Sequence, residues 1–251
     1  MFLKVIACEI AARELYYLAA RSRNLIDLEL LTQGYHDTPA AGREEIQKRI
    51  AAVPAGKYDA IALGYALCSN ILVGLTTAHT PLVIPRAHDC ITFFLGSKER
   101  YQECFAARPG TYYYTSGWLE FAQRRGHKGL VWGGVSLPAS ASQGLRSTYE
   151  QWAQKYGEDQ AQYLLAEMSR WAEAYSHGTL IDFEFVRDLK LPEQVRQICA
   201  DKGWQYDEVE GDLGLLQRLL AGEWDDSAFL VVQPGQKVVA TFDDKVIGTA
   251  P

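Results

Sequence analysis

The chain has 251 residues, of which 48% are apolar and 12% aromatic, and its formal net charge is -6. This apolar content is enough for one large domain or two modest lobes with a core. The acidic balance argues against a surface for nucleic acid or anionic membrane, because either would need a concentrated basic face. No apolar run approaches the roughly 20 residues that cross a bilayer, and the N-terminus lacks a signal-peptide pattern. We therefore expect a cytoplasmic protein.

The first part of the chain alternates between strand and helix patterns. A helix follows the first strand, and a second helix starts at Thr38-Pro39, with Lys48 and Arg49 near its end, where the helix dipole favours basic residues. Such alternation predicts parallel strands, which we place at residues 2–7, 25–31, 59–64 and 82–85.

The later part contains a further strand, a loop and a helical block before the strand and helix pattern returns. Residues 130–143 are rich in Gly, Ser, Ala and Pro, which indicates a loop. Because this loop is long for a connection, we interpret it as a mobile cover or a hinge. Aromatic residues recur at helical spacing from about 145 to 175. The remaining strands are expected at residues 111–115, 180–185, 204–209 and 228–232, with a terminal hairpin at 238–247.

The repeated order of strands and helices predicts the fold class. We expect an α/β protein with mostly parallel, doubly wound sheets, in two similar Rossmann-like lobes with a helical insertion and a cleft between them. The predicted divisions are an N-terminal lobe over 1–128, a loop and helical connector over 129–177, and a C-terminal lobe over 178–251.

Three predicted strands end at a cysteine. Cys8 follows the first strand, Cys68 follows the strand at 59–64, and the strand at 82–85 runs into His88-Asp89-Cys90. Open α/β sheets bind ligands at the carboxyl ends of their strands, where parallel strands would bring these residues together. We therefore predict a metal site formed by Cys8, Cys68, His88 and Cys90.

A set of three cysteines and one histidine suits tetrahedral zinc, and cysteines equally hold the irons of a [4Fe-4S] cluster. The ligands lack the close CxxC spacing of stronger motifs, and cysteines at strand ends are also common as small core residues. In a reducing compartment these cysteines are thiols and not a disulfide framework. The other two, Cys104 and Cys199, fall on helical apolar stripes and are expected in the core.

Residues beside the proposed ligands are candidates for catalysis and substrate binding. Glu9 and Asp89 can orient an imidazole or transfer protons, or they can cap helices. Arg86 either binds an anionic substrate group or pairs with a neighbouring carboxylate.

Three further residues near strand ends are candidate substrate contacts. Tyr65 and Trp118 can line an aromatic pocket, although aromatic residues near strand ends more often belong to the core. His36 is either a contact or a surface group. The chain contains no Gly-rich phosphate loop, so nucleotide binding has no support.

Five segments of the chain carry a resemblance to a known family, namely residues 8–10, 64–70, 85–92, 111–118 and 209–213. They resemble a family of uncharacterised prokaryotic proteins known only as a domain of unknown function. Members of this family often occur beside corrinoid-dependent methyltransferase systems in anaerobes. The resemblance spans most of the chain and implies a place in one-carbon chemistry, with a corrinoid or a corrinoid protein as a possible partner.

Two functions follow from these observations. The first is a metalloenzyme in which a Cys/His-bound zinc ion or iron–sulfur cluster supports corrinoid-linked methyl transfer, since zinc holds a thiol as the thiolate that attacks a methyl donor. The second is a non-catalytic carrier or accessory protein that binds a metal, a cofactor or a small molecule for a partner enzyme.

Overall fold

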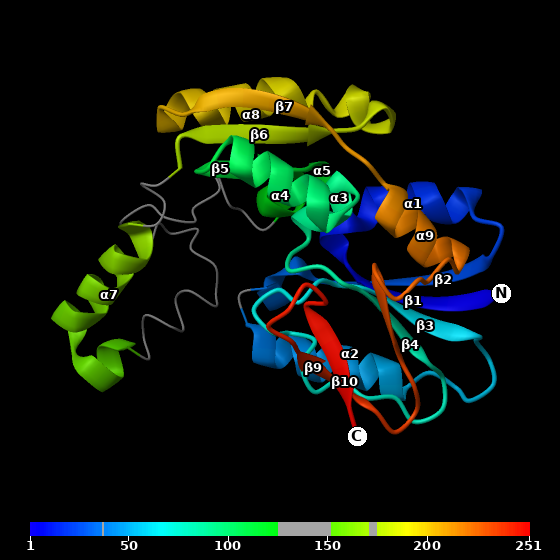
Figure 1. Ribbon diagram of the computed structural model, residues 1–251. Helices are drawn as coiled ribbons and strands as arrows, with labels where there is room; N and C mark the ends of the chain where they lie inside the picture. The colour runs from blue at the N-terminus through cyan, green and yellow to red at the C-terminus, as the bar shows by residue number, and fades with distance from the viewer. Residues whose placement is uncertain (37, 125–151, 171–174) are drawn as a thin grey trace. The chain divides into compact units, whose positions relative to one another are not determined.

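The computed structural model describes residues 1–36, 38–124, 152–170 and 175–251 (Figure 1). The chain forms two compact units: unit 1 comprises Met1–Glu103 and Gly211–Pro251, and unit 2 comprises Cys104–Glu210. Both units combine a largely parallel sheet with helices, so the predicted α/β class and the mostly parallel strands are confirmed. In the described part of the chain no helix is long and apolar enough to span a membrane.

Unit 1 is built on a five-stranded sheet in the order β2-β1-β3-β4-β8. The first four strands are parallel, and β8 pairs antiparallel with β4 at one edge. Val, Ile, Leu and Ala dominate the central strands, as is typical of strands buried on both faces. The strands are β1 (Phe2–Cys8), β2 (Leu25–Leu31), β3 (Ala60–Gly64), β4 (Leu82–Pro85) and β8 (Phe229–Val232).

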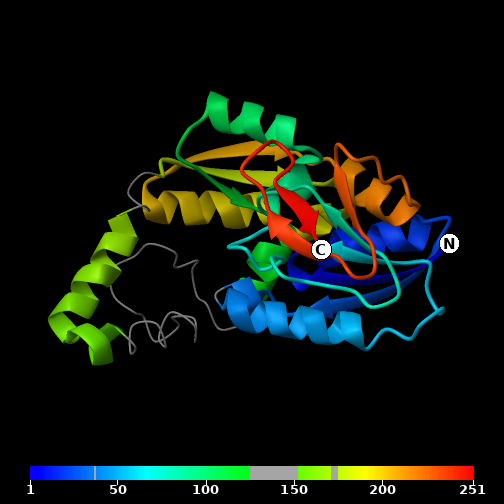
Figure 2. The same ribbon diagram turned by 60° about the horizontal axis from the view of Figure 1, so that its bottom comes forward.

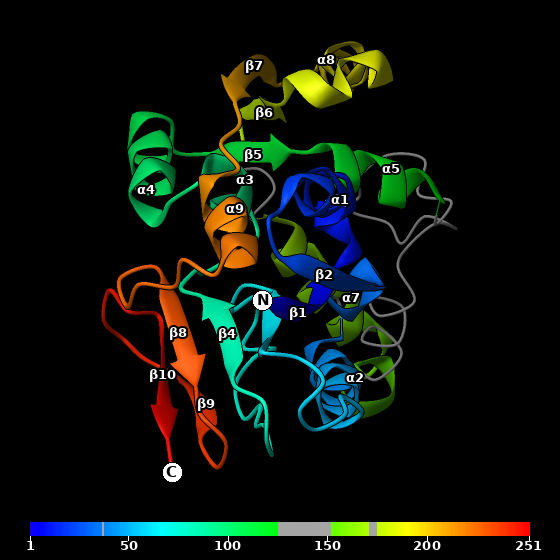
Figure 3. The same cartoon turned by 90° about the vertical axis from the view of Figure 1, so that its right-hand side faces the viewer.

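Helices cover both faces of this sheet. Figure 3 shows α1 (Ala12–Arg21) and α9 (Gly214–Ala221) on one face and α2 (Pro39–Ala51) on the other. The hairpin of β9 (Lys237–Ala240) and β10 (Ile247–Ala250) contributes apolar residues to the core on the α2 side. Short helices follow the strand ends: η1 (Glu9–Ala11), η2 (Gln33–His36) and α3 (Ile91–Leu95). Helix α4 (Lys98–Ala107) comes after α3 and contains the boundary between the two units.

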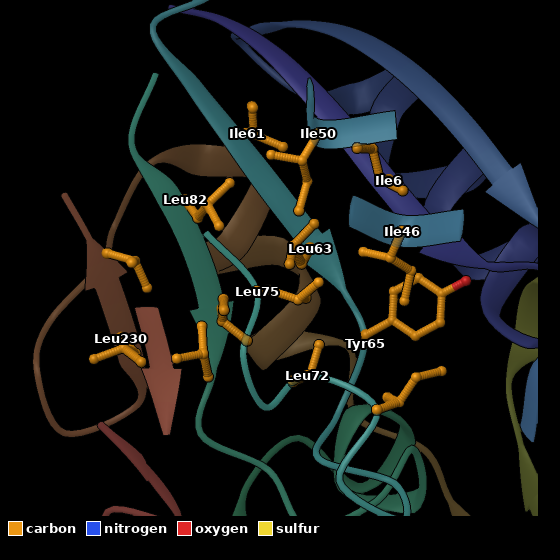
Figure 4. Close-up of a cluster of buried hydrophobic side chains, with 14 of the residues drawn as sticks. Ile6, Ile46, Ile50, Ile61, Leu63, Tyr65, Leu72, Leu75, Leu82 and Leu230 are labelled. Atoms are coloured by element: carbon orange, nitrogen blue, oxygen red, sulfur yellow. The ribbon is translucent and has the colours of Figure 1, made fainter. Parts of the chain in front are cut away.

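The core on the α2 side of the sheet packs up to the carboxyl ends of the strands. Figure 4 shows Ile6, Ile46 and Leu63 in this cluster, and Cys8 and Cys68 pack against its border. At the end of β3, a Cβ atom on Gly64 would lie 2.5 Å from the Cβ of Ala7, so β1 and β3 approach closely only because residue 64 is glycine. The strand ends that carry the cysteines are therefore fixed by tight packing.

Unit 2 has a three-stranded parallel sheet in the order β5-β6-β7. Helix α8 (Leu191–Lys202) packs on β6 and β7, and Figure 2 shows it in yellow along one face of the sheet. The other elements of the unit are β5 (Thr111–Tyr114), α5 (Ser116–Arg124), α7 (Glu158–Arg170), β6 (His177–Asp182), η4 (Glu184–Leu189) and β7 (Gln205–Glu210).

The two units divide the chain at other points than the predicted 1–128, 129–177 and 178–251. The expected C-terminal lobe is shared between the units, because β6 and β7 pair with β5 whereas β8 adds to the unit 1 sheet. The chain returns to unit 1 where the N–H of Asp212 donates to the carbonyl of Phe94 at 2.8 Å. The predicted loop at 130–143 and the start of the helical block lie outside the described residues.

Candidate functional site

The carboxyl ends of β1, β3 and β4 bring three cysteines to one edge of the unit 1 sheet. Cys8 is the last residue of β1, and Cys68 and Cys90 follow the ends of β3 and β4. Strand β2 lies on one side of β1, and β3 and β4 lie on the other, so the chain changes direction across the sheet between β1 and β3. Such a switch point, at the carboxyl ends of the strands, is where open α/β sheets bind ligands. We call Cys8, Tyr65, Cys68 and Cys90 the cysteine edge.

Backbone hydrogen bonds hold Cys68 beside the segment that leads to Cys90. Beyond the ends of β3 and β4, Leu67 N donates to Ala87 O and Cys68 N donates to His88 O, both at 2.9 Å. The thiols of Cys68 and Cys90 share a hydrogen bond. Two residues that are distant in sequence therefore meet as a thiol pair.

The pKa of the Cys90 thiol is raised well above its ordinary value. The largest cause is the hydrogen bond with Cys68, followed by burial and by the charges of Cys68, Asp89 and Cys8. When two such groups share a proton, the second proton leaves only at higher pH. The contribution of Cys8 also shows that this third cysteine lies within electrostatic reach of the pair.

Cys68 begins a turn with left-handed backbone. The φ angles of Cys68, Ser69 and Asn70 are 29°, 55° and 63°. Asn70 tolerates this region, but residues such as Cys68 and Ser69 each cost about 1–2 kcal/mol there, so the turn carries local strain. Ile71 N closes the turn by donating to Leu67 O at 3.0 Å and to Cys68 O at 3.2 Å. Backbone strain of this kind clusters at functional sites, which supports the choice of this edge.

Tyr65 lies directly after β3 and is 5% exposed. Its hydroxyl is buried and has no hydrogen-bond partner among the described residues. Burial raises its pKa strongly, and the charges of Cys8, Tyr35, Glu9 and Cys68 add to this effect. In Figure 4 the ring borders the apolar cluster and the hydroxyl oxygen points away from the labelled leucine side chains. A buried donor without a partner beside several thiols is suited to a ligand.

The carboxylate of Glu9 binds the loop that follows β2. Its Oε1 accepts from Gln33 N at 2.8 Å and from Thr32 Oγ1 at 3.1 Å. These bonds fix the loop between β2 and η2 against the end of β1. Glu9 therefore has a structural role beside the predicted catalytic one, which stays a prediction.

Asp89 lies between His88 and Cys90 and caps the start of α3. Its Oδ1 accepts from Ile91 N at 3.0 Å, and its Oδ2 accepts from the hydroxyl of Tyr101 at 2.9 Å. Burial raises the pKa of this carboxyl, although both hydrogen bonds act in the opposite direction. The capping role matches one of the two interpretations that the sequence left open.

Arg86 is held by the C-terminal strands. Its side chain is 2% exposed, and its Nη2 forms an ion pair with Asp226 Oδ1 at 2.8 Å. Its Nε donates to the carbonyls of Asp226 and Phe229, and its Nη1 donates to those of Lys245 and Ile247. We call these contacts the Arg86 clamp. Of the two predicted roles, the structure shows the pairing with a carboxylate, because the donors are engaged within the protein.

The remaining residues that the sequence singled out are His88, His36, Trp118 and the cysteines outside the edge. His88 is exposed, and its carbonyl accepts from Cys68 N. His36 is the last residue of η2, and its side chain lies outside the described part of the structure. Trp118 lies on α5 in unit 2, and its role as a substrate contact stays a prediction. Cys199 is buried, as predicted, whereas Cys104 on α4 is partly exposed.

The four ligands named from the sequence stay a prediction. Within residues 1–36, 38–124, 152–170 and 175–251, no three His, Cys, Asp or Glu side chains form a group that could hold a metal ion. The thiols of the cysteine edge therefore lie near one another without a preset coordination geometry.

Two residues at this edge were missed by sequence reasoning. Tyr35 lies in η2 beyond the end of β2, and its charge affects Tyr65, so its place after a strand end was a usable signal. Arg43 on α2 donates from Nη2 to the carbonyl of Asn70 at 3.3 Å and supports the left-handed turn. Nothing in the helical sequence around Arg43 indicated this contact.

Residues 30–220 match the family described as "Protein of unknown function (DUF1638)", so the chain belongs to this family. The matched region includes Cys68, His88 and Cys90, whereas Cys8 and Glu9 precede it. No curated protein and no solved structure matches the chain. The resemblance to an uncharacterised family is thereby confirmed, and the association with corrinoid systems stays an expectation.

Proposed function

We propose that Cys8, Cys68 and Cys90 bind a thiophilic metal ion, either zinc or the irons of a [4Fe-4S] cluster, at the carboxyl edge of the unit 1 sheet. One observation carries this proposal: three neighbouring parallel strands end near three cysteines at one edge of the sheet, and the thiols of Cys68 and Cys90 share a hydrogen bond. Sulfur is the donor that both metals prefer. Binding would release the thiol protons and draw the sulfurs toward one point, because the coordination geometry is not preset.

His88 is the proposed fourth ligand for zinc, whereas three cysteines alone would leave one iron of a cluster open to substrate. The carbonyl of His88 accepts a hydrogen bond from Cys68 N, which fixes the backbone of His88 beside Cys68. The His88 side chain is exposed and is therefore accessible to a bound ion. Cys8, Cys68 and Cys90 are partly exposed as residues, although the thiol of Cys90 is buried. The cytoplasm, which keeps thiols reduced, is the proposed location.

The reaction that we propose for this site is corrinoid-linked methyl transfer. A bound zinc ion would keep a thiol deprotonated at neutral pH, and a thiolate accepts a methyl group from a donor such as a methyl-corrinoid. The hydroxyl of Tyr65, buried next to the sulfurs, supplies a hydrogen-bonding group for the bound ligand.

A carrier function is the second candidate, and one observation favours it. Glu9, Asp89 and Arg86, the charged groups proposed for catalysis and substrate binding, are all engaged in hydrogen bonds that hold the fold. A site with thiols and few uncommitted charges suits stoichiometric binding of a metal, cofactor or small molecule for a partner enzyme.

Metal content tests the proposal directly. The protein is purified without oxygen, its metals are measured, and its absorption spectrum is recorded for wild type, Cys68→Ala and Cys90→Ala. Cys104→Ser is the matched control, because Cys104 is also partly exposed but belongs to helix α4 and does not follow a strand. We expect stoichiometric metal in wild type and the control and a large loss in the two variants. Equally little metal in all four proteins would refute the proposal.

The spectrum and turnover separate the candidates. An iron–sulfur cluster gives broad brown absorption, zinc is colourless and a corrinoid is red. Methyl transfer from a methyl-corrinoid to a thiol would establish the enzyme, whereas tight binding without turnover would establish the carrier.

A further inference from the structure

The pair formed by Cys68 and Cys90 has properties that do not depend on a metal. Their thiols are in hydrogen-bond contact, although the residues follow different strands. Both residues are partly exposed. By contrast, Cys199 is buried and its thiol donates to the carbonyl of Gly178 at 3.7 Å. Cys68 and Cys90 thus form a pair of neighbouring thiols at the strand ends.

The backbone around this pair keeps the two sulfurs adjacent. The bond from Cys68 N to His88 O at 2.9 Å fixes the two segments side by side, and α3 begins directly after Cys90. The left-handed turn that starts at Cys68 is closed by Ile71. A disulfide requires the sulfurs to approach to about 2.05 Å, and the backbone bond between Cys68 and His88 holds the two segments that carry them side by side.

We propose that Cys68 and Cys90 are a redox-active dithiol that exchanges with small-molecule disulfides. The thiolate of one cysteine attacks a sulfur of the small disulfide, breaks its S–S bond and releases one small thiol. The sulfur of the other cysteine then attacks the mixed disulfide, forms the Cys68–Cys90 bond and releases the second small thiol. The two protons of the cysteines end on the two released thiols, and the small disulfide is the oxidant that is reduced.

Oxidation of this pair would prevent metal binding at the cysteine edge. This consequence rests on the proposed function. The disulfide removes two of the three sulfur ligands, so only the reduced protein would bind metal. Disulfides in reducing compartments are usually transient and serve catalysis or redox sensing, which fits an exchangeable pair at a ligand site.

Thiol counting in redox buffers tests the dithiol. The full chain, freed of metal by a chelator, is equilibrated without oxygen in mixtures of oxidised and reduced glutathione. Remaining thiols are then alkylated and the peptides mapped by mass spectrometry. We expect two of the five thiols to disappear reversibly, with a single cross-linked peptide pair that joins Cys68 to Cys90. Retention of all five thiols, or a cross-link of either residue to Cys8, would overturn the proposal.

Variants separate this proposal from the metal site. Cys104→Ser should form the disulfide like wild type, and Cys68→Ser and Cys90→Ser should each give only a mixed disulfide with glutathione. Cys8→Ser is the separating variant, because it should lose metal under reducing conditions and still form the Cys68–Cys90 bond. Metal binding without a disulfide would refute the dithiol alone, and a disulfide without metal binding would refute the proposed function alone.

Discussion

Arg86 and Tyr65 are buried polar side chains at the ends of neighbouring strands, yet their surroundings differ. Arg86, at the end of β4, has hydrogen bonds from all three guanidinium nitrogens. Tyr65, at the end of β3, has a buried hydroxyl without a partner in the described residues. A buried polar group without a hydrogen bond costs about 1–3 kcal/mol. The Arg86 clamp therefore holds the fold together, whereas the cysteine edge retains an unfavourable group that a ligand would satisfy.

The largest expected effect is the loss of the Arg86 clamp. Arg86→Met leaves several carbonyl groups between β4 and the C-terminal strands without a donor, and we expect the free energy of unfolding to fall by about 3 kcal/mol. Urea unfolding followed by circular dichroism measures this. Arg187→Met is the control, since this arginine is 71% exposed in its ion pair with Glu184 and should change stability by less than about 0.5 kcal/mol. If Arg86→Met changed the free energy of unfolding as little as Arg187→Met, the hydrogen bonds of the Arg86 clamp would not stabilise the fold.

A group of ion pairs lies near the start of β1, where Lys4 contacts the carboxylates of Asp27 and Glu29. The hydrogen bond from Tyr58, together with the hydrogen bond and the charge of Lys4, lowers the pKa of Asp27 below its ordinary 3.8. The resulting stabilisation is fully present above pH 3.8 and is lost as the pH falls through the lowered folded value. We expect Asp27→Asn to cost on the order of 1 kcal/mol at neutral pH, because the side chain is partly exposed.

The pH dependence of unfolding tests the role of the Asp27 carboxylate. Unfolding is measured from pH 7 down to pH 3 for wild type and Asp27→Asn, and the difference between them should shrink below about pH 4. A difference that stays constant over this range would show that the carboxylate charge contributes nothing.

Tyr65→Phe removes a hydroxyl group from the cysteine edge and should not destabilise the fold. Because the hydroxyl has no partner, its removal should leave the free energy of unfolding unchanged or raise it by up to about 1 kcal/mol. Tyr58→Phe is the matched control: Tyr58 is 8% exposed and its hydroxyl donates to Asp27, so its loss should be destabilising. Equal destabilisation by both variants in urea would show that the Tyr65 hydroxyl is paired within the fold.

The smallest effect concerns the left-handed turn. Ser69→Gly removes the Cβ of a residue with φ of 55°, and we expect a stabilisation of roughly 0.5 kcal/mol after the greater unfolded-state entropy of glycine is included. Differential scanning calorimetry of the metal-free protein measures the change as a shift in Tm. A lowered Tm would show that the serine side chain contributes more than the strain costs.

The sequence predicted the strands of unit 1 and the place of its cysteines well. Local pattern was sufficient, because β1, β2, β3 and β4 are apolar runs that end at polar turns. Parallel pairing then brings the ends of β1, β3 and β4 to one edge, so the nearness of Cys8, Cys68 and Cys90 followed from topology alone.

The features that were not predicted depend on contacts between distant segments. The apolar run of β8 reads the same whether it pairs within a C-terminal lobe or antiparallel to β4. The burial of Arg86 results from that pairing, since its partners lie more than a hundred residues later in the chain. The left-handed backbone at Cys68 and Ser69 had no signal in the residue types, because only Asn70 commonly tolerates this conformation.

A cobalt titration tests most directly whether the thiols of β1, β3 and β4 form one site. Reduced, metal-free protein is titrated with Co²⁺ without oxygen, and the sulfur-to-cobalt charge-transfer absorption is compared among wild type, Cys8→Ser, Cys68→Ser, Cys90→Ser and Cys104→Ser. We predict saturable binding, a band that weakens by a similar amount in Cys8→Ser, Cys68→Ser and Cys90→Ser, and no change in Cys104→Ser. A band that is absent from wild type, or unaffected by Cys8→Ser, would contradict this prediction.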